Sequence, residues 1–156
     1  YYDKRHLFSY ARENDTYNHG KNKIILNLKG WRILPLVCYD LRFPVWSRRS
    51  KNADYDLLIY VANWPERRIF AWKQLLIARA IENQCYVAGL NRTGNDGNNI
   101  FHSGESAVID FKGENITGDI TSENFIQTFT LPKEPLDNFR KQFAFYDDGD
   151  EFEVKR

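Results

Sequence analysis

Three apolar segments with little polar alternation stand out along the chain. They are residues 33–37 (ILPLV), 55–63 (YDLLIYVAN) and 85–91 (CYVAGLN). Apolar runs of this length are typical of strands covered on both faces, as in a parallel sheet. We therefore predict three central strands.

The segments between these strands predict helices. A short helix is expected at residues 45–49, directly after Pro44. The clearest helix is expected within residues 66–84, where apolar side chains recur at helical spacing and charges lie on the other side: Ile69, Trp72, Leu76 and Ala80. Alternating strands and helices imply parallel pairing through crossovers, and hence a layered α/β domain.

The flanking segments predict further elements. The turn-forming pair Lys29-Gly30 separates the apolar runs 24–28 and 33–37, which indicates a hairpin. Toward the C-terminus we expect a strand in residues 105–115 that enters a turn at Lys112-Gly113, a strand at 124–131, a helix at 135–143, and a polar tail with three aromatic residues at 144–156. The tail is expected to pack on the rest of the protein rather than fold alone.

Composition limits the class of protein. With 156 residues, of which 42% are hydrophobic, the chain is long enough for one domain with a core. Its net charge of +1 provides no global field for nucleic acid or an anionic membrane. No apolar run is long enough to cross a bilayer and no signal-peptide pattern opens the sequence, so we expect a cytoplasmic protein. The absence of Met indicates that the sequence begins inside a longer polypeptide.

The two cysteines, Cys38 and Cys85, form no zinc-binding spacing, so any role is that of a thiol. Ligands of open parallel sheets bind outside the carboxyl ends of the strands. Cys38 lies at such an end, whereas Cys85 lies at the amino end of its strand. We therefore expect Cys38 to be a candidate nucleophile and Cys85 to be structural.

Other residues are expected at the same edge as Cys38. Asn63 and Trp64 follow the second strand, and Arg92 follows the third. The segment after Cys38 predicts a helix start, whose backbone N–H groups, beginning with Tyr39, would face a developing oxyanion. Tyr39, Asn63, Trp64 and Arg92 are accordingly our candidates for substrate binding.

Several motifs occur in one order along most of the chain. They are YDKRHLF (2–8), LVCYDLRFP (36–44), ANWP (62–65), RAIENQ (79–84), NRTG (91–94) and GESAVIDFKGE (104–114). This set resembles the nitrilase superfamily of carbon–nitrogen hydrolases, and within it the omega-amidase type. The resemblance implies the C-terminal portion of a four-layer α-β-β-α sandwich: one domain over 1–156, with a core at 1–131 and a C-terminal helix and tail at 132–156.

The resemblance also implies a reaction and a set of catalytic residues. The expected activity is hydrolysis of the terminal amide of a 2-oxo dicarboxylic acid monoamide, through a thioester on Cys38 and without metal or organic cofactor. The motif places the family's lysine at Lys4, which would stabilise the oxyanion. A supporting glutamate, seven residues before Gly20, falls on Glu13, with Asp15 as a competitor for its role. The general-base glutamate of the family is expected upstream of Tyr1.

Two further expectations concern support and assembly. Arg42, Arg79 and Glu82 are interpreted as structural charges that brace the Cys38 loop through a buried arginine–carboxylate pair. The resemblance implies a homodimer acting on a small-molecule amide.

Three alternatives remain open at this level. A cysteine–histidine dyad would need His6, His19 or His102 near Cys38. Another activity of the same family, such as that of a nitrilase or a carbamoylase, would use the same nucleophile. Finally, the chain would serve as an interaction domain if it were a non-catalytic relative or fragment.

Overall fold

The computed structural model describes residues 1–118 and 124–154. The strands are β1 (Leu26–Leu28), β2 (Trp31–Val37), β3 (Leu57–Ala62), β4 (Tyr86–Asn91), β5 (Thr93–Asn95), β6 (Phe101–Ser103) and β7 (Ala107–Ile109). The α-helices are α1 (Pro44–Ser47), α2 (Ile69–Asn83) and α3 (Lys133–Gln142). Short 3₁₀ helices are η1 (Ser9–Ala11), η2 (Glu13–Asp15), η3 (Cys38–Arg42), η4 (Glu66–Arg68) and η5 (Phe145–Asp148).

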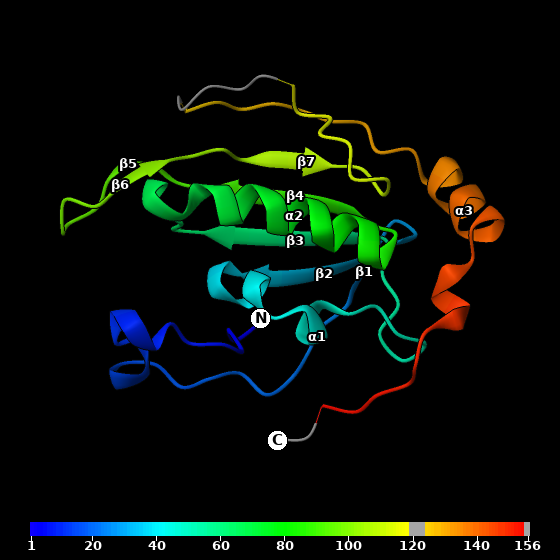
Figure 1. Cartoon of the computed structure of the whole chain (residues 1–156), viewed down its shortest axis with the longest axis horizontal. Coiled ribbons are helices and arrows are strands. Elements are labelled where there is room, and N and C mark those ends of the chain that lie inside the picture. The colour runs from blue at the N-terminus through cyan, green and yellow to red at the C-terminus, as the bar shows by residue number, and fades with distance from the viewer. Residues whose placement is uncertain (119–123, 155–156) are drawn as a thin grey trace.

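A mixed five-stranded sheet in the order β1-β2-β3-β4-β7 forms the centre of the fold (Figure 1). The three predicted central strands β2, β3 and β4 pair in parallel, which confirms the expected α/β arrangement. The predicted hairpin is also confirmed, because β1 pairs antiparallel with β2. Lys29 and Gly30 turn the chain there with φ values of 47° and 80°, as both residues of a tight hairpin turn require.

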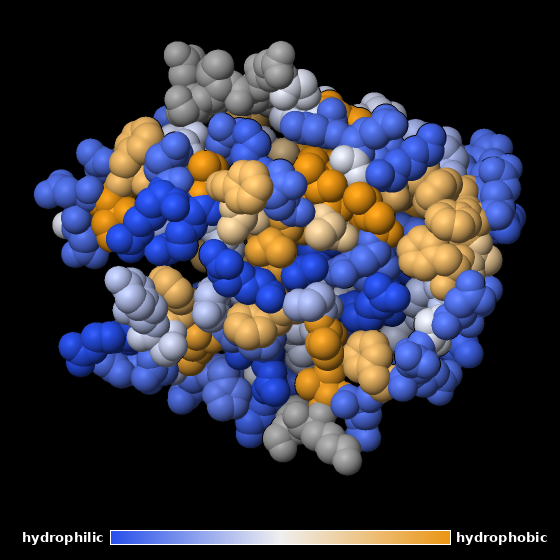
Figure 2. Space-filling model, in the orientation of Figure 1, coloured by the Kyte–Doolittle hydropathy of each residue, from blue (hydrophilic) through white to orange (hydrophobic). Residues whose placement is uncertain are grey.

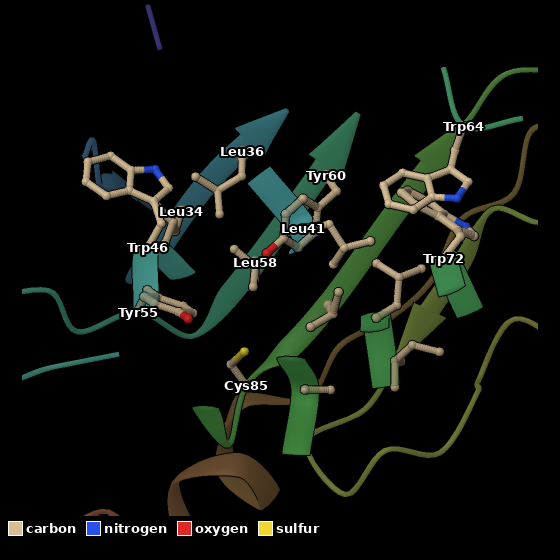
Figure 3. Close-up of a cluster of buried hydrophobic side chains, with 14 residues drawn as sticks. Leu34, Leu36, Leu41, Trp46, Tyr55, Leu58, Tyr60, Trp64, Trp72 and Cys85 are labelled. Atoms are coloured by element: carbon tan, nitrogen blue, oxygen red, sulfur yellow. The ribbon is translucent and has the colours of Figure 1, made fainter. Parts of the chain in front are cut away.

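Helix α2 covers one face of this sheet and closes the main core (Figures 1 and 3). Leu34, Leu58 and Val87 lie side by side across the parallel strands and are fully buried beneath it. Gly89 of β4 lies directly under the helix, because a Cβ there would come within 2.5 Å of Leu76 Cδ1. The core therefore depends on a missing side chain in β4 as well as on apolar ones.

The opposite face of the sheet is covered only in part within the described residues. Near the amino ends of the strands, Leu136 of α3 packs with Tyr86 and Phe111 in a second apolar cluster. Toward the carboxyl ends, Val61 and Leu90 are 49% and 51% exposed. We predicted that both faces of the sheet are covered. Within the described residues, this holds for the face under α2 and only in part for the opposite face.

A buried carboxylate joins α3 to the amino end of the sheet. Asp56 is fully buried, and its two oxygens accept hydrogen bonds from Arg32 and from Arg140 of α3. Lys133 of α3 lies 3.2 Å from the same carboxylate. Burial alone would raise the pKa of Asp56, but the hydrogen bonds and charge of Arg32, with Lys133, outweigh it and hold this pKa well below its usual range.

The prediction of a strand at residues 124–131 is wrong. This segment has no strand pairing, and Ile126 is fully exposed. The outer edge of β7 is already occupied, since Ile116 N donates to Val108 O and residue 109 bridges residue 115. An alternating pattern with no free edge to join does not become a strand.

The predicted C-terminal helix and the packing of the tail are both observed. Helix α3 spans Lys133–Gln142, and η5 follows it. In the tail, the ring of Tyr146 lies 4.2 Å from the guanidinium carbon of Arg49. Within the described residues, no helix is long and apolar enough to cross a membrane.

Candidate active site

The carboxyl ends of β2 and β3 open into a cleft of about 1270 Å³. The N-terminal segment with η1 and η2 forms one wall, and the β5–β6 hairpin reaches the other, where the surface is notched (Figure 2). Six of the seven residues singled out from the sequence line this cleft: Lys4, Glu13, Cys38, Tyr39, Asn63 and Trp64. The strand-end rule therefore brought distant segments together correctly.

Cys38 stands at the turn where β2 passes into η3. Its φ of 45° lies in the left-handed region, which is costly for a residue other than glycine. The strain presents the thiol at the mouth of the cleft, where Sγ lies 3.9 Å from Asn63 O. Cys85, by contrast, is fully buried, and burial raises the pKa of its thiol to about 12, as expected for a structural cysteine.

Lys4 and Glu13 form an ion pair on the wall of the cleft. Lys4 Nζ lies 2.6 Å and 2.9 Å from the two carboxylate oxygens of Glu13, and both side chains are largely buried. The backbone N–H of Phe8 donates to the same carboxylate at 2.8 Å. Asp15 instead pairs with the exposed Arg12, so of the two candidate acids it is Glu13 that holds the lysine.

Asp40, which the sequence analysis did not single out, joins the N-terminal segment that carries Lys4 to the turn at Cys38. Its carboxylate is fully buried and accepts hydrogen bonds from Tyr2 Oη, His6 N, His6 Nδ1 and Val37 N at 2.8 to 3.1 Å. Tyr2 and His6 flank Lys4 in the sequence. The anchor therefore fixes the segment carrying Lys4 on both sides.

Gly20 also holds the segment that carries Lys4 in place. Its N–H donates to Lys4 O at 2.8 Å, and a Cβ at this position would lie 2.0 Å from Asp3 O. Only glycine allows the two backbones to approach this closely. The spacing between Glu13 and Gly20 noted in the sequence thus spans a loop that closes back onto Lys4.

Polar contacts also fix the strand ends. The side chain of Asn91 accepts from Trp64 N at 2.7 Å and donates to Trp64 O at 2.9 Å. Arg79 pairs with Glu82 at 2.9 Å and donates to Leu41 O at 2.7 Å, which confirms the expected brace on the Cys38 loop. The signal for Asn91 was its place at a strand end, where a side-chain amide can bond a neighbouring loop.

Two arginines differ from their predicted places. Arg42 takes no part in the buried arginine–carboxylate pair; its guanidinium carbon lies 4.8 Å from the centre of the Trp64 ring and it lines the cleft. Arg92 is exposed, donates to Asn95 O, and does not line the cleft with the other candidates. Arg92 follows β4, which ends at the same edge of the sheet as the strand before Cys38. The chain turns there into β5, and Arg92 lies outside the cleft.

The electrostatics of Cys38 favour the protonated thiol. Burial raises the pKa of this thiol above its ordinary value. The positive charge of Lys4 lowers the pKa, and the negative charge of Glu13 raises it. Because burial is the largest influence, attack by this sulfur requires a base that removes its proton.

His6 and His102 are not placed as the partner of Cys38 in a cysteine–histidine dyad. His6 is bound to Asp40 and stacked on Phe43 with ring centres 3.7 Å apart. His102 borders the cleft, where its Nδ1 contacts Ile100 O. Among the described residues, the hydrogen-bond partner of Cys38 Sγ is Asn63 O and not a histidine.

The family model for carbon-nitrogen hydrolases matches residues 1–136. The chain belongs to the carbon-nitrogen hydrolase family. Its α/β fold is accordingly of the nitrilase type, as the sequence motifs implied.

Three known proteins illustrate what the chain is similar to. Omega-amidase YafV of Escherichia coli (strain K12) is 52% identical over 99% of this chain and 59% of that protein. The 2-oxoglutaramate amidase of Bacillus subtilis (strain 168) is 43% identical over 70% of this chain and 42% of that protein. XC1258 from Xanthomonas campestris, solved with an arsenic adduct in its active site, is 45% identical, with a TM-score of 0.94, over 99% of this chain and 60% of that one.

Proposed function

We propose that the complete gene product is an omega-amidase that hydrolyses the terminal amide of a 2-oxo dicarboxylic acid monoamide to the dicarboxylate and ammonia. One observation carries the proposal: Cys38 on its strained turn faces the same cleft as the Lys4–Glu13 pair. The chain spans 59% of the length of YafV, to which it is 52% identical, and so the activity of the whole protein is inferred from this part.

In the first half of the proposed reaction, Cys38 Sγ forms a bond with the amide carbon while its proton passes to a carboxylate base. In this proposal the base is the glutamate that the family resemblance implies upstream of Tyr1. The carbonyl π electrons move to oxygen, and Lys4 Nζ and the Tyr39 N–H stabilise the resulting negative charge. When the carbonyl re-forms, the carbon–nitrogen bond breaks and the base returns the proton to the leaving ammonia.

In the second half, water attacks the thioester. The base removes a proton from the water, the carbon–sulfur bond breaks, and the proton returns to Cys38 as the carboxylic acid leaves. The net change is one amide and one water converted to one carboxylic acid and one ammonia. The cysteine and the base end as they began, so no redox partner is required.

Glu13 has a supporting role in this proposal. Its carboxylate already binds Lys4 through both oxygens and also accepts the Phe8 N–H. A carboxylate committed to three donors is suited to fix and neutralise the lysine rather than to shuttle protons. We therefore assign Glu13 to positioning Lys4 for the oxyanion.

Ammonia release from 2-oxoglutaramate by the purified complete gene product tests the proposal. We expect turnover that Cys38→Ala abolishes. The matched variant Cys85→Ala should retain it, because Cys85 is buried at the amino end of β4, at the opposite end of the sheet from Cys38. Turnover that survives Cys38→Ala would refute the mechanism. A protein that is folded, has a reactive Cys38 and yet hydrolyses no amide would favour the interaction-domain alternative.

We further propose a cytoplasmic homodimer, as the resemblance implies. Phe70 and Ile81 on α2 support a contact surface outside the cleft, because these apolar side chains are 76% and 46% exposed. Light scattering should give the mass of two chains for the wild-type protein and of one for Phe70→Glu. A wild-type monomer at micromolar concentration would overturn this part.

A further inference from the structure

Four cationic side chains line the cleft, Lys4, Arg42, Arg67 and Arg68, against three acidic ones, Asp3, Glu13 and Asp96. Arg42, Arg67 and Arg68 all line it, and among the described residues no carboxylate lies within ion-pair distance of any of them. Arginine side chains are strongly favoured to pair with carboxylates or phosphates when partly desolvated. The part of the cleft that these arginines line is therefore suited to bind an anion from outside.

Among the described residues, the three acidic side chains that line the cleft, Asp3, Glu13 and Asp96, form no ion pair with these arginines. Glu13 is bound to Lys4. Asp96 accepts the backbone N–H groups of Asn98 and Ile100 at 2.8 and 3.0 Å, which hold its carboxylate within its own turn. The three arginines thus keep their charge available for a ligand.

Two contacts position Arg68 at the cleft. It ends η4, and Trp64 Nε1 donates to its carbonyl at 2.8 Å, which fixes its backbone to the wall of the cleft. Its guanidinium carbon lies 5.2 Å from the centre of the Phe8 ring. Arg68 is half-buried, whereas its neighbour Arg67 is exposed.

The surroundings of Arg68 are unfavourable for an isolated cation. Burial lowers the pKa of this guanidinium, and the charges of Arg67 and Arg42 lower it further. A negative charge on Cys38 raises the pKa of Arg68, so the Cys38 sulfur and the Arg68 guanidinium interact electrostatically. An anion bound between the arginines and the sulfur would relieve this repulsion.

We propose that Arg68, assisted by Arg42, binds the carboxylate at the end of the substrate remote from the amide and so determines specificity for acidic amides. This assignment rests on the proposed amidase function and deepens it. With the amide carbon at Cys38, the carbon chain crosses the cleft and the carboxylate meets the planar guanidinium of Arg68, which can form two parallel hydrogen bonds. Arg68 takes the place that the sequence analysis gave to Arg92.

The test compares two amides of equal chain length, 2-oxoglutaramate and the uncharged valeramide, in the complete gene product. Loss of a charged hydrogen-bonding partner typically costs a factor of about 10 to 100. We expect Arg68→Gln to lower kcat/KM for 2-oxoglutaramate by about that factor, mainly through KM, and to change kcat/KM for valeramide less than about threefold. Arg12→Gln is the matched control, since this guanidinium is 85% exposed and lies outside the cleft.

Three results would overturn the assignment. Equal losses for both amides in Arg68→Gln would mean that the residue only supports the fold or the nucleophile. A wild-type protein with no preference for the charged amide would remove the need for a carboxylate site. A selective loss in Arg92→Gln with none in Arg68→Gln would return the role to Arg92.

A binding measurement keeps the inference separate from the amidase proposal. Calorimetry with the product 2-oxoglutarate uses the Cys38→Ala protein, in which no turnover occurs. We expect Arg68→Gln in this background to weaken binding at least about tenfold, and Arg12→Gln to leave it unchanged. If binding depends on Arg68 while the wild-type protein hydrolyses no amide, the proposed function fails and the carboxylate site stands; unchanged binding in Arg68→Gln overturns the site.

Discussion

Asp40 joins the segment that carries Lys4 to the turn at Cys38, and its replacement by Asn tests this connection. The two side chains have nearly the same shape, so packing is preserved. The carboxylate accepts two donors on each oxygen: His6 N and His6 Nδ1 on Oδ1, and Tyr2 Oη and Val37 N on Oδ2. An amide offers one oxygen and one NH₂ group, so it cannot accept from all four donors.

The arrangement that costs least places the new NH₂ group at the position of Oδ2. Val37 N–H then faces another donor in a fully buried site, and the Tyr2 hydroxyl, which already accepts from Trp46 Nε1 and Arg5 N, loses the acceptor for its own proton. One stranded donor costs about 1–3 kcal/mol, and loss of charge on the remaining bonds adds about 1 kcal/mol. We therefore expect Asp40→Asn to lower the free energy of unfolding by about 2–4 kcal/mol.

Urea unfolding followed by tryptophan fluorescence measures this change, since Trp46 itself donates to Tyr2 Oη. Ammonia release measured in the same preparations should fall more than tenfold, because Lys4 is held through the same anchor. Asp148→Asn, at an exposed position, is the control and should behave as wild type. A loss below about 0.5 kcal/mol with unchanged activity would refute the anchoring role, since that is the range of ordinary surface substitutions.

Three further predictions follow from other parts of the structure. Lys4→Met should raise the pKa of the Cys38 thiol and slow its alkylation by iodoacetamide near neutral pH, because the charge that lowers this pKa is removed. Asp56 has a depressed pKa in the folded state, so its contribution to stability is present above its unfolded pKa of about 4 and is lost as the pH falls below that value; Asp56→Asn should therefore flatten the acid limb of the stability curve. Gly89→Ala should destabilise the fold by about 1–3 kcal/mol through overlap with Leu76.

Each of these has a result that would contradict it. Faster alkylation of Cys38 in Lys4→Met would mean that the lysine does not stabilise the thiolate. An acid limb that keeps its slope in Asp56→Asn would assign acid unfolding to other carboxylates. Wild-type stability of Gly89→Ala, measured by thermal unfolding, would show that α2 can shift away from the sheet without cost.

Much of the fold could be predicted because its signals are local. The apolar runs of β2, β3 and β4, the helical spacing in α2 and the turn pair Lys29-Gly30 each specify their element within a few residues. The error at 124–131 has a different origin. Its alternating pattern is that of a strand, but strand formation needs a free neighbouring edge, and residues 115–117 already cover β7.

In the candidate site, too, some residues could be identified from the sequence and others only from the structure. The thiol at a strand end and the lysine motif could be found from residue order. Asp40 could not, because an aspartate two residues after a cysteine gives no sign that Tyr2 and His6 will bind it. Arg42 could not be placed for a related reason: its guanidinium packs on the ring of Trp64, a contact between segments more than twenty residues apart.

The amino-acid sequence by itself determined the central strands β2, β3 and β4 with helix α2 between β3 and β4, the choice of Cys38 over Cys85 as candidate nucleophile, and membership of a family through motifs in a fixed order. Only the tertiary structure decided which charges meet. It joined Lys4 to Glu13 and buried Asp40 beneath the segment that carries Lys4. It also left Arg68 in the cleft without an ion-pair partner among the described residues, and turned Arg92 away from the cleft. The physical reason is that local propensity depends on neighbours in the chain, whereas ion pairing and desolvation depend on neighbours in space.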